Sequence, residues 1–173
     1  MGLLLFCVFL GWGRLRAARA DGEAMRGLNL DRQKEISVLG TVRALEEKDS
    51  AALLKQFSKR TQKEEKDLEK QIEGLMEYYQ GERKEFKGDA ATSEETEYGR
   101  LVEKSFLGNY TLMTDQKTYR VCYKFQLADE NKDEVGLSAL EFVTEETYQK
   151  AVEAQGYYSW KFQGKLKGVY WTD

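Results

Sequence analysis

The chain has 173 residues, of which 41% are hydrophobic and 33% charged, and this composition excludes wholesale disorder and favours one globular domain. The net charge is −3, and residues 21–173 are more acidic still because Arg14, Arg16 and Arg19 all precede them. An acidic domain lacks the clustered Lys and Arg that bind phosphate backbones, so we expect no nucleic-acid partner. The absence of histidine removes the commonest general base and the commonest transition-metal ligand, so we expect neither a metal nor another cofactor.

Residues 1–20 form a signal-like apolar segment. Residues 3–12 are nearly all apolar, too short a run to span a bilayer but of the length of a signal-peptide core. Ala18-Arg19-Ala20 matches the A-x-A cleavage pattern and predicts a cut before Asp21. No Lys or Arg precedes the run, and the three arginines follow it, where positive charge opposes translocation. The alternative is a short apolar helix attached to a cytosolic domain.

The two cysteines, Cys7 and Cys122, bear on lipid attachment and redox chemistry. Cys7 follows Leu-Leu-Phe, and the large Phe6 makes this a poor match to a bacterial lipoprotein motif. Removal of residues 1–20 would leave Cys122 as the one thiol, with no internal disulfide and no thiolate zinc cluster. Cys122 lies in a strand-like run, which favours a buried, inert thiol.

Residues 21–29 are predicted to be a flexible lead, and residues 30–173 a single domain that begins with three amphipathic helices. Asp49 or Ser50 is the expected N-cap of the second helix and Gly81 the stop of the third. Apolar residues at helical spacing define the buried stripes: Ile36, Leu39, Val42 and Leu45, with Val38; Leu53, Leu54 and Phe57; and Leu68, Ile72, Leu75, Met76 and Tyr79.

After Gly81 the apolar period changes from 3.6 to 2, which predicts an antiparallel meander. The expected elements are, in order, a polar strand over 82–87, a mobile loop over 89–96, a strand over 101–114 bent at Gly108-Asn109, a turn at 115–117, a strand over 119–127, a turn at 129–133, a strand over 136–143, a helix from the Thr144 cap to Gly156, and strand pieces over 158–167 and 169–171. The fold class is therefore α+β, with the N-terminal helices packed on one face of a curved, cone-like antiparallel sheet.

This order of elements resembles the nuclear-transport-factor-two-like (cystatin-like) cone fold over about residues 30–173. Five short stretches resemble those of uncharacterised Gram-positive lipoproteins and secreted domains of that fold: DSAALLKQFS (49–58), QIE (71–73), YQG (79–81), VGLS (135–138) and GVYW (168–171). The resemblance implies an exported or membrane-tethered protein of unknown role. Because the cone fold carries enzymes and binding modules alike, it does not assign an activity.

In a cone fold the curved sheet and the helices enclose a pocket, and rings on the strands are its candidate lining. The candidates are Tyr110, Tyr119, Tyr123, Phe125 and Trp171. Such rings suit a flat apolar or sugar-like ligand. They equally suit a core that they fill themselves, as strand aromatics usually do.

Carboxylates are the remaining candidates for chemistry. Glu103 and Glu141 lie within predicted strands, and a carboxylate inside a pocket has a raised pKa and can act as a base. Glu141 stands between Leu140 and Phe142, so alternation predicts that it points to the opposite, solvated face. The acidic turn over 129–133 lacks the glycine and bidentate glutamate of a calcium loop.

Three functions remain open. The favoured one is an extracytoplasmic, secreted or envelope-associated binding module without enzymatic activity, with a small ligand or an envelope protein as partner and membrane association through residues 1–20. The alternative is a cone-fold isomerase, dehydratase or hydrolase that uses a pocket carboxylate. The third is a homodimer through the outer face of the 119–127 strand, whose side chains are polar: Arg120, Cys122, Lys124 and Gln126.

Overall fold

The computed structural model describes residues 32–161 and 167–172. The chain divides between Ile36 and Ser37, and the second unit, Ser37–Asp173, carries the fold. The predicted signal-like segment (1–20) and flexible lead (21–29) lie outside the described residues. Within the described part of the chain, no helix combines the length and the apolar content needed to cross a membrane.

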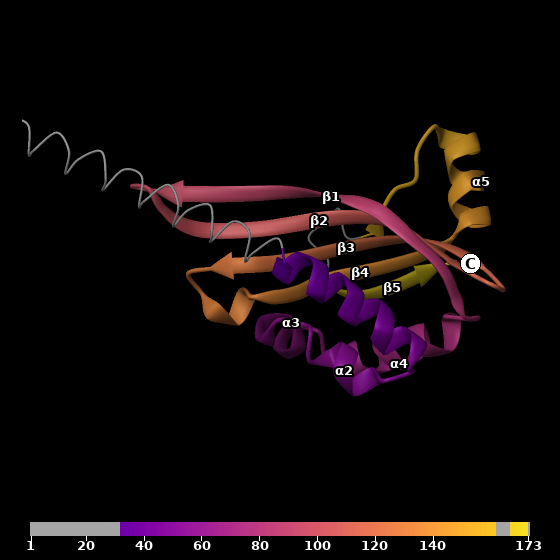
Figure 1. The fold of residues 1–173 in the computed structure, drawn as a ribbon, viewed down its shortest axis with the longest axis horizontal. Helices are drawn as coiled ribbons and strands as arrows, with labels where there is room; N and C mark the ends of the chain where they lie inside the picture. Colours follow the sequence, from indigo (N-terminus) through magenta and orange to yellow (C-terminus); the bar gives the residue numbers. More distant parts are fainter. Residues whose placement is uncertain (1–31, 162–166, 173) are drawn as a thin grey trace, which may run out of the picture. The chain divides into compact units, whose positions relative to one another are not determined.

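The helices come first and the sheet follows, as expected for the predicted α+β class (Figure 1). A helix that ends at residue 46 precedes α2 (Ser50–Leu54), α3 (Lys59–Glu64) and α4 (Leu68–Tyr78). The strands are β1 (Arg83–Glu97), β2 (Arg100–Thr114), β3 (Thr118–Asp129), β4 (Gly136–Thr144) and β5 (Gly168–Thr172). The short helix η1 (Lys132–Glu134) joins β3 to β4, and α5 (Glu145–Gln155) lies between β4 and β5.

The strands form one sheet in the order β1-β2-β3-β4-β5. The first three pairs are antiparallel, as predicted, but β5 runs parallel to β4. A parallel pair needs a crossover connection, and α5 with the chain that follows it provides one. Figure 1 shows α2, α3 and α4 on one side of the sheet and α5 on the other.

Side-chain caps explain where the helices begin. Asp49 accepts a hydrogen bond from the Ala52 N–H (2.8 Å), Ser58 from Thr61 (3.1 Å) and Thr144 from Thr147 (3.3 Å). Gly156 ends α5 in the left-handed conformation with φ +83°. The expected caps at Asp49, Thr144 and Gly156 are therefore confirmed.

Lys48 fixes the end of α4 from outside that helix. Its ammonium donates hydrogen bonds to the carbonyl oxygens of Met76 and Tyr79, which α4 leaves unsatisfied. The same ammonium lies 5.1 Å from the centre of the Tyr79 ring, and burial lowers its pKa. Lys48 thereby ties the end of the first helix to the end of α4.

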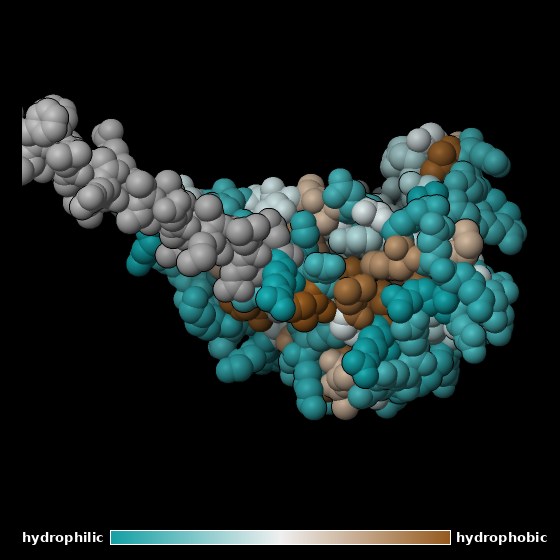
Figure 2. All heavy atoms as spheres, in the orientation of Figure 1, coloured by the Kyte–Doolittle hydropathy of each residue, from teal (hydrophilic) through white to brown (hydrophobic). Residues whose placement is uncertain are grey.

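The core lies between the helices and one face of the sheet. Its largest fully buried side chains include Tyr119, Tyr123, Phe106, Phe142, Leu45, Leu53, Leu68, Ile72 and Leu75. The predicted stripe of the first helix was partly wrong, because Ile36 is 60% and Leu39 45% exposed while Val38, Val42 and Leu45 are buried. Figure 2 shows hydrophobic atoms gathered beside this helix on a surface that is otherwise mostly hydrophilic.

The predicted mobile loop over 89–96 was wrong, since these residues belong to β1. They pair with β2 residue by residue, for example Asp89 with Asn109 and Ala91 with Leu107. The turn that makes this hairpin possible is Tyr98-Gly99, where both residues have positive φ (49° and 75°), the conformation of two-residue hairpin turns. The partner strand rather than the composition of 89–96 decides its structure.

Two further strand predictions need correction. Residues 158–160 are irregular rather than extended, and 162–166 lie outside the described residues. The break expected at Gly108-Asn109 is absent; the register of β2 against β3 shifts between Lys104 and Ser105 instead. Gly108 has a different role, because a Cβ there would lie 2.3 Å from the Tyr110 ring.

Gly108→Ala tests this close approach. Gly108 does not have a positive φ, so alanine adds a clash with the Tyr110 ring but no backbone strain. We expect the free energy of unfolding, measured by urea titration, to fall by about 1–3 kcal/mol. The neighbouring, exposed Asn109→Ala should stay within about 0.5 kcal/mol of wild type. Equal stability of the two variants would contradict the packing described.

Candidate functional site

The five rings predicted to line a pocket all lie on the helix-facing side of the sheet. Tyr119 contacts the Tyr78 ring of α4 (5.6 Å between centroids), and the Tyr123 hydroxyl lies 3.3 Å from Thr41 Oγ1. Tyr110 pairs with Val121 and Phe125 with Phe106, and directly opposed residues share a face.

Tyr119 and Tyr123 fill the core, with 0% and 1% of their surface exposed. The Tyr119 hydroxyl accepts a hydrogen bond from the Gln80 N–H (2.9 Å) and donates one to the Tyr78 carbonyl (3.2 Å). Burial raises the pKa of Tyr123. Tyr110 and Phe125 are half-buried in ring stacks, so a ligand role for these four residues stays a prediction.

Trp171 differs from the other four because it is partly exposed and lines an open groove. This Trp171 groove lies between α4 and β5 and has a volume of about 550 Å³. Its lining residues are Asp67, Lys70, Gln71, Glu73, Gly74, Glu77 and Trp171. The indole ring rests directly on α4 at Gly74, where a Cβ would lie 2.5 Å from the ring.

Two hydrogen bonds from α4 hold the strand on either side of Trp171. Gln71 Oε1 accepts from the Val169 N–H (2.9 Å), and the Tyr78 hydroxyl donates to the Thr172 carbonyl (2.7 Å). Gln71 and Tyr78 are seven residues apart, about two helical turns, and so project from the same side of α4. The ring of Trp171 is therefore held against Gly74 from both sides.

Carboxylates dominate the groove. Asp67, Glu73 and Glu77 stand against the single cation Lys70. A second hollow of about 250 Å³ between α2 and α4 shares Glu73 and adds Glu69. None of these carboxylates forms an ion pair with another described residue.

The chemistry that this arrangement offers is recognition of a cation with an apolar portion. The face of an indole attracts ammonium and guanidinium groups, and carboxylates accept charge-assisted hydrogen bonds from them. A metal site is a poorer fit, since no group of three or more candidate ligands occurs among the residues that the structure describes. Sequence reasoning found Trp171 but missed the carboxylates, although their spacing along α4 was visible in the sequence.

Glu141 occupies the opposite face of the sheet, as predicted, but the expected solvent exposure was wrong because 0% of its surface is exposed. Its carboxylate accepts a hydrogen bond from the Lys161 N–H (2.7 Å) and contacts the Tyr158 hydroxyl (3.4 Å). Three rings cover this part of the sheet: Tyr148, Tyr158 and Trp160, with centroids 5.0–6.1 Å apart. The missed factor is the crossover from α5 to β5, which packs over a face that alternation alone leaves solvated.

Cys122 lies opposite Glu141 on the adjacent strand and is 1% exposed. Burial, reinforced by the negative charge of Glu141, raises the pKa of its thiol to about 12. The thiol is therefore protonated at neutral pH and a poor nucleophile, in agreement with the inert cysteine that was predicted. The Trp171 groove and the α2–α4 hollow include neither Glu141 nor the exposed Glu103.

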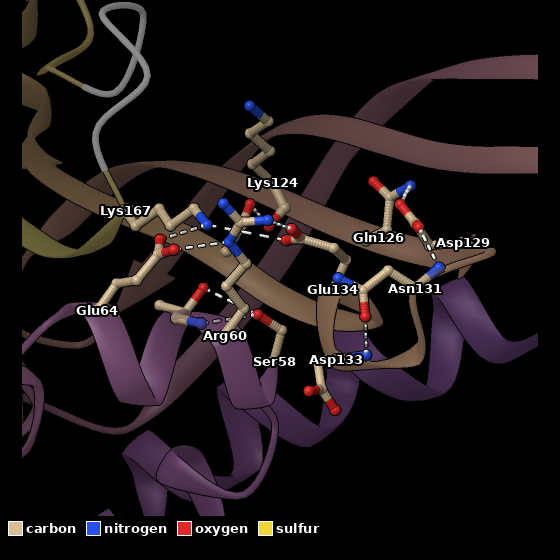
Figure 3. A network of polar contacts seen from close by, with 12 residues as sticks. Ser58, Arg60, Glu64, Lys124, Gln126, Asp129, Asn131, Asp133, Glu134 and Lys167 are labelled. Atoms are coloured by element: carbon tan, nitrogen blue, oxygen red, sulfur yellow. Dashed lines mark hydrogen bonds and ion pairs between the residues drawn. The ribbon is translucent and has the colours of Figure 1, made fainter.

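A charge-balanced network joins three distant segments near the start of β5 (Figure 3). Arg60 of α3 pairs with Glu64 (2.6 Å) and Glu134 of η1, and Lys167 pairs with the same two carboxylates (2.7 and 3.8 Å). Hydrogen bonds from Lys167 and Arg60 hold the pKa of Glu64 below its usual value. Because two cations pair with two anions, the charges within the network balance, and it offers no net charge to a ligand.

Glu141→Ala tests the anchoring role of this carboxylate. Its removal takes away a buried carboxylate and leaves the Lys161 N–H without its acceptor, so we expect a loss of about 1–3 kcal/mol in the free energy of unfolding. The matched control is Glu103→Ala, an exposed strand carboxylate, which should change stability by less than about 0.5 kcal/mol. Amide exchange at Lys161 should accelerate in the first variant alone; unchanged exchange would argue against the anchor.

Most of this domain matches one known protein family. A family model described as a domain of unknown function (DUF5104) matches residues 40–145. Comparison with curated proteins gives no match. The matched range begins in the first helix and ends at the start of α5, so it includes α4 and its carboxylates but not Trp171. Because the match spans more than half of the sequence, this chain belongs to the DUF5104 family of domains of unknown function.

Proposed function

We propose that this domain is a non-enzymatic binding module that takes a cationic, partly apolar ligand in the Trp171 groove. The observation that carries the proposal is the packing of the Trp171 ring on Gly74. Three carboxylates that line the same groove have no ion-pair partner among the described residues. A peptide segment that alternates Arg or Lys with apolar residues has the required chemistry.

The size of the groove supports this ligand class. About 550 Å³ lies within the range of small-ligand sites, and the adjoining α2–α4 hollow continues the acidic surface past Glu73. Leu54, which is partly exposed in that hollow, offers apolar contact for a side chain next to the cation. The two hollows together suit an extended segment better than a single small ion.

The proposal also includes the cellular location and the fold family of the chain. The signal-like residues 1–20 support an exported or envelope-associated protein. Helices on one side of a curved sheet, in this order along the chain, support a nuclear-transport-factor-two-like cone fold. The resemblance to Gram-positive lipoprotein and secreted domains points to an envelope protein as the natural source of the peptide segment.

The alternative, a cone-fold enzyme with a pocket carboxylate, finds less support. Such a carboxylate must face a hollow that substrate can enter and from which water is excluded. Glu141 is buried beneath Tyr158 and Trp160, and the carboxylates of the Trp171 groove lie on an open, solvated surface.

A charge-neutralising double variant tests the binding site. Titration calorimetry with the acetylated, amidated peptide Arg-Leu-Arg-Leu-Arg should detect binding to the full chain. Glu73→Gln with Glu77→Gln removes two acceptor charges at nearly constant shape, so the Kd should rise roughly fivefold to tenfold. The control Glu153→Gln, an exposed carboxylate on α5, should bind like wild type.

A second arm separates charge from shape. The peptide Glu-Leu-Glu-Leu-Glu should not bind wild type, because its charges repel those of the groove. Trp171→Phe keeps an aromatic ring but weakens the cation–π contact and should raise the Kd for the basic peptide about threefold. Wild-type affinity in the Glu73/Glu77 variant would remove the groove from consideration.

A further inference from the structure

Strand β1 is an exposed edge of the sheet and is unusually long. It spans Arg83–Glu97, fifteen residues, whereas strands in globular proteins average about five or six. It is the end member of the strand order, and the side chains along it are almost all exposed. A sheet edge of this length offers a row of backbone donors and acceptors to another strand.

One feature that usually blocks such an edge, proline, is missing from β1, whereas charged side chains line the strand and its register against β2 shifts between Arg83 and Glu85 and between Glu95 and Thr96. The chain contains no proline, so no position of the strand lacks a backbone donor. The N–H of Ala90, at the middle of the strand, donates a hydrogen bond to the side chain of Asp89 (2.7 Å), an acceptor on the same strand.

Charge is segregated along β1. Residues 83–87 carry the cations Arg83, Lys84 and Lys87 against one carboxylate, Glu85. Residues 89–97 carry four carboxylates and no cation: Asp89, Glu94, Glu95 and Glu97. One end of the strand is therefore basic, the other is acidic, and the small residues Ala90-Ala91 lie between them.

We propose that two copies of this chain pair through β1, antiparallel, around a two-fold axis near Ala90-Ala91. In this arrangement the basic end of each strand lies beside the acidic end of the other, and each copy uses the same surface. Parallel pairing in register would put like charges opposite one another, which is destabilising. The charge pattern thus selects a closed dimer over an open stack.

The charges needed for this pairing are available. Arg83 already pairs with Glu46 (2.8 Å) and Glu94 with Lys104 (3.1 Å). Lys84 and Lys87 contact only carboxylates three residues away or fewer, and their side chains stay 54% and 63% exposed. Glu95 and Glu97 are exposed and form no ion pair with a described residue.

The outer face of β3, the dimer surface predicted from the sequence, is less suited to this role. Tyr148 of α5 lies 5.0 Å from the Arg120 guanidinium, and Trp160 packs on Cys122. Much of that face is therefore covered by the chain's own crossover. The β1 edge has no such cover among the described residues.

Charge-swap variants of the full chain test the proposal by sedimentation velocity, at protein concentrations from about 1 to about 200 μM. The basic-end variant is Lys84→Glu with Lys87→Glu, and the acidic-end variant is Glu95→Lys with Glu97→Lys. Wild type should dimerise, more weakly in about 500 mM than in about 50 mM NaCl. Each variant alone should raise the dimer Kd by about tenfold or more, while an equimolar mixture should form a heterodimer.

A control with the same change in net charge as the basic-end variant is Lys63→Glu with Lys66→Glu, two exposed positions away from β1. It should dimerise like wild type, and circular dichroism should show the same fold in all variants. A wild type that stays monomeric throughout, variants that dimerise as well as wild type, or a mixture that fails to restore pairing would each overturn the proposal. None of these outcomes depends on peptide binding at the Trp171 groove.

Discussion

The packing of Tyr119 against the end of α4 is the constraint on which the rest of this structure depends. The ring is completely buried near the start of β3, the middle strand of the sheet, and its hydroxyl bridges Gln80 and Tyr78 at the end of the helix. Lys48 binds carbonyls at the same helix end from the other side. An orphaned polar group here would cost about 1–3 kcal/mol, so α4 has one favourable position on the sheet.

Everything proposed for the groove follows from that position. Once α4 is fixed, Gln71 and Tyr78 reach the backbone of β5, and Gly74 leaves the space that the indole occupies. The carboxylates of α4 then stand beside the ring because they occupy the solvent side of the same helix. The binding chemistry proposed for the surface and the packing of the core thus both depend on the position of α4.

Local signals in the sequence account for much of the fold. Asp49, Thr144 and Gly156 mark helix ends by chemistry that acts within a few residues, and the alternation from Tyr119 to Leu127 is that of a half-buried strand. The misses share a different cause. Residues 89–96 are a strand because β2 pairs with them, and Glu141 is buried because a later crossover covers it. Both outcomes depend on contacts with segments distant in sequence, and the apolar periodicity within a segment carries no information about such contacts.

The candidate site divides in the same way. Trp171 was identifiable as an aromatic residue on a strand of the predicted curved sheet, but its packing on Gly74 joins residues almost a hundred positions apart.

This separation in sequence also has a consequence for the kinetics of folding. The hydrogen bonds from α4 to β5 join residues 94 and 98 positions apart in the sequence, and β5 is the end member of the sheet, paired with β4. Closing such long loops costs conformational entropy before the contacts form, so we expect the α4–β5 contacts, and with them the groove proposed as a binding site, to form late in folding.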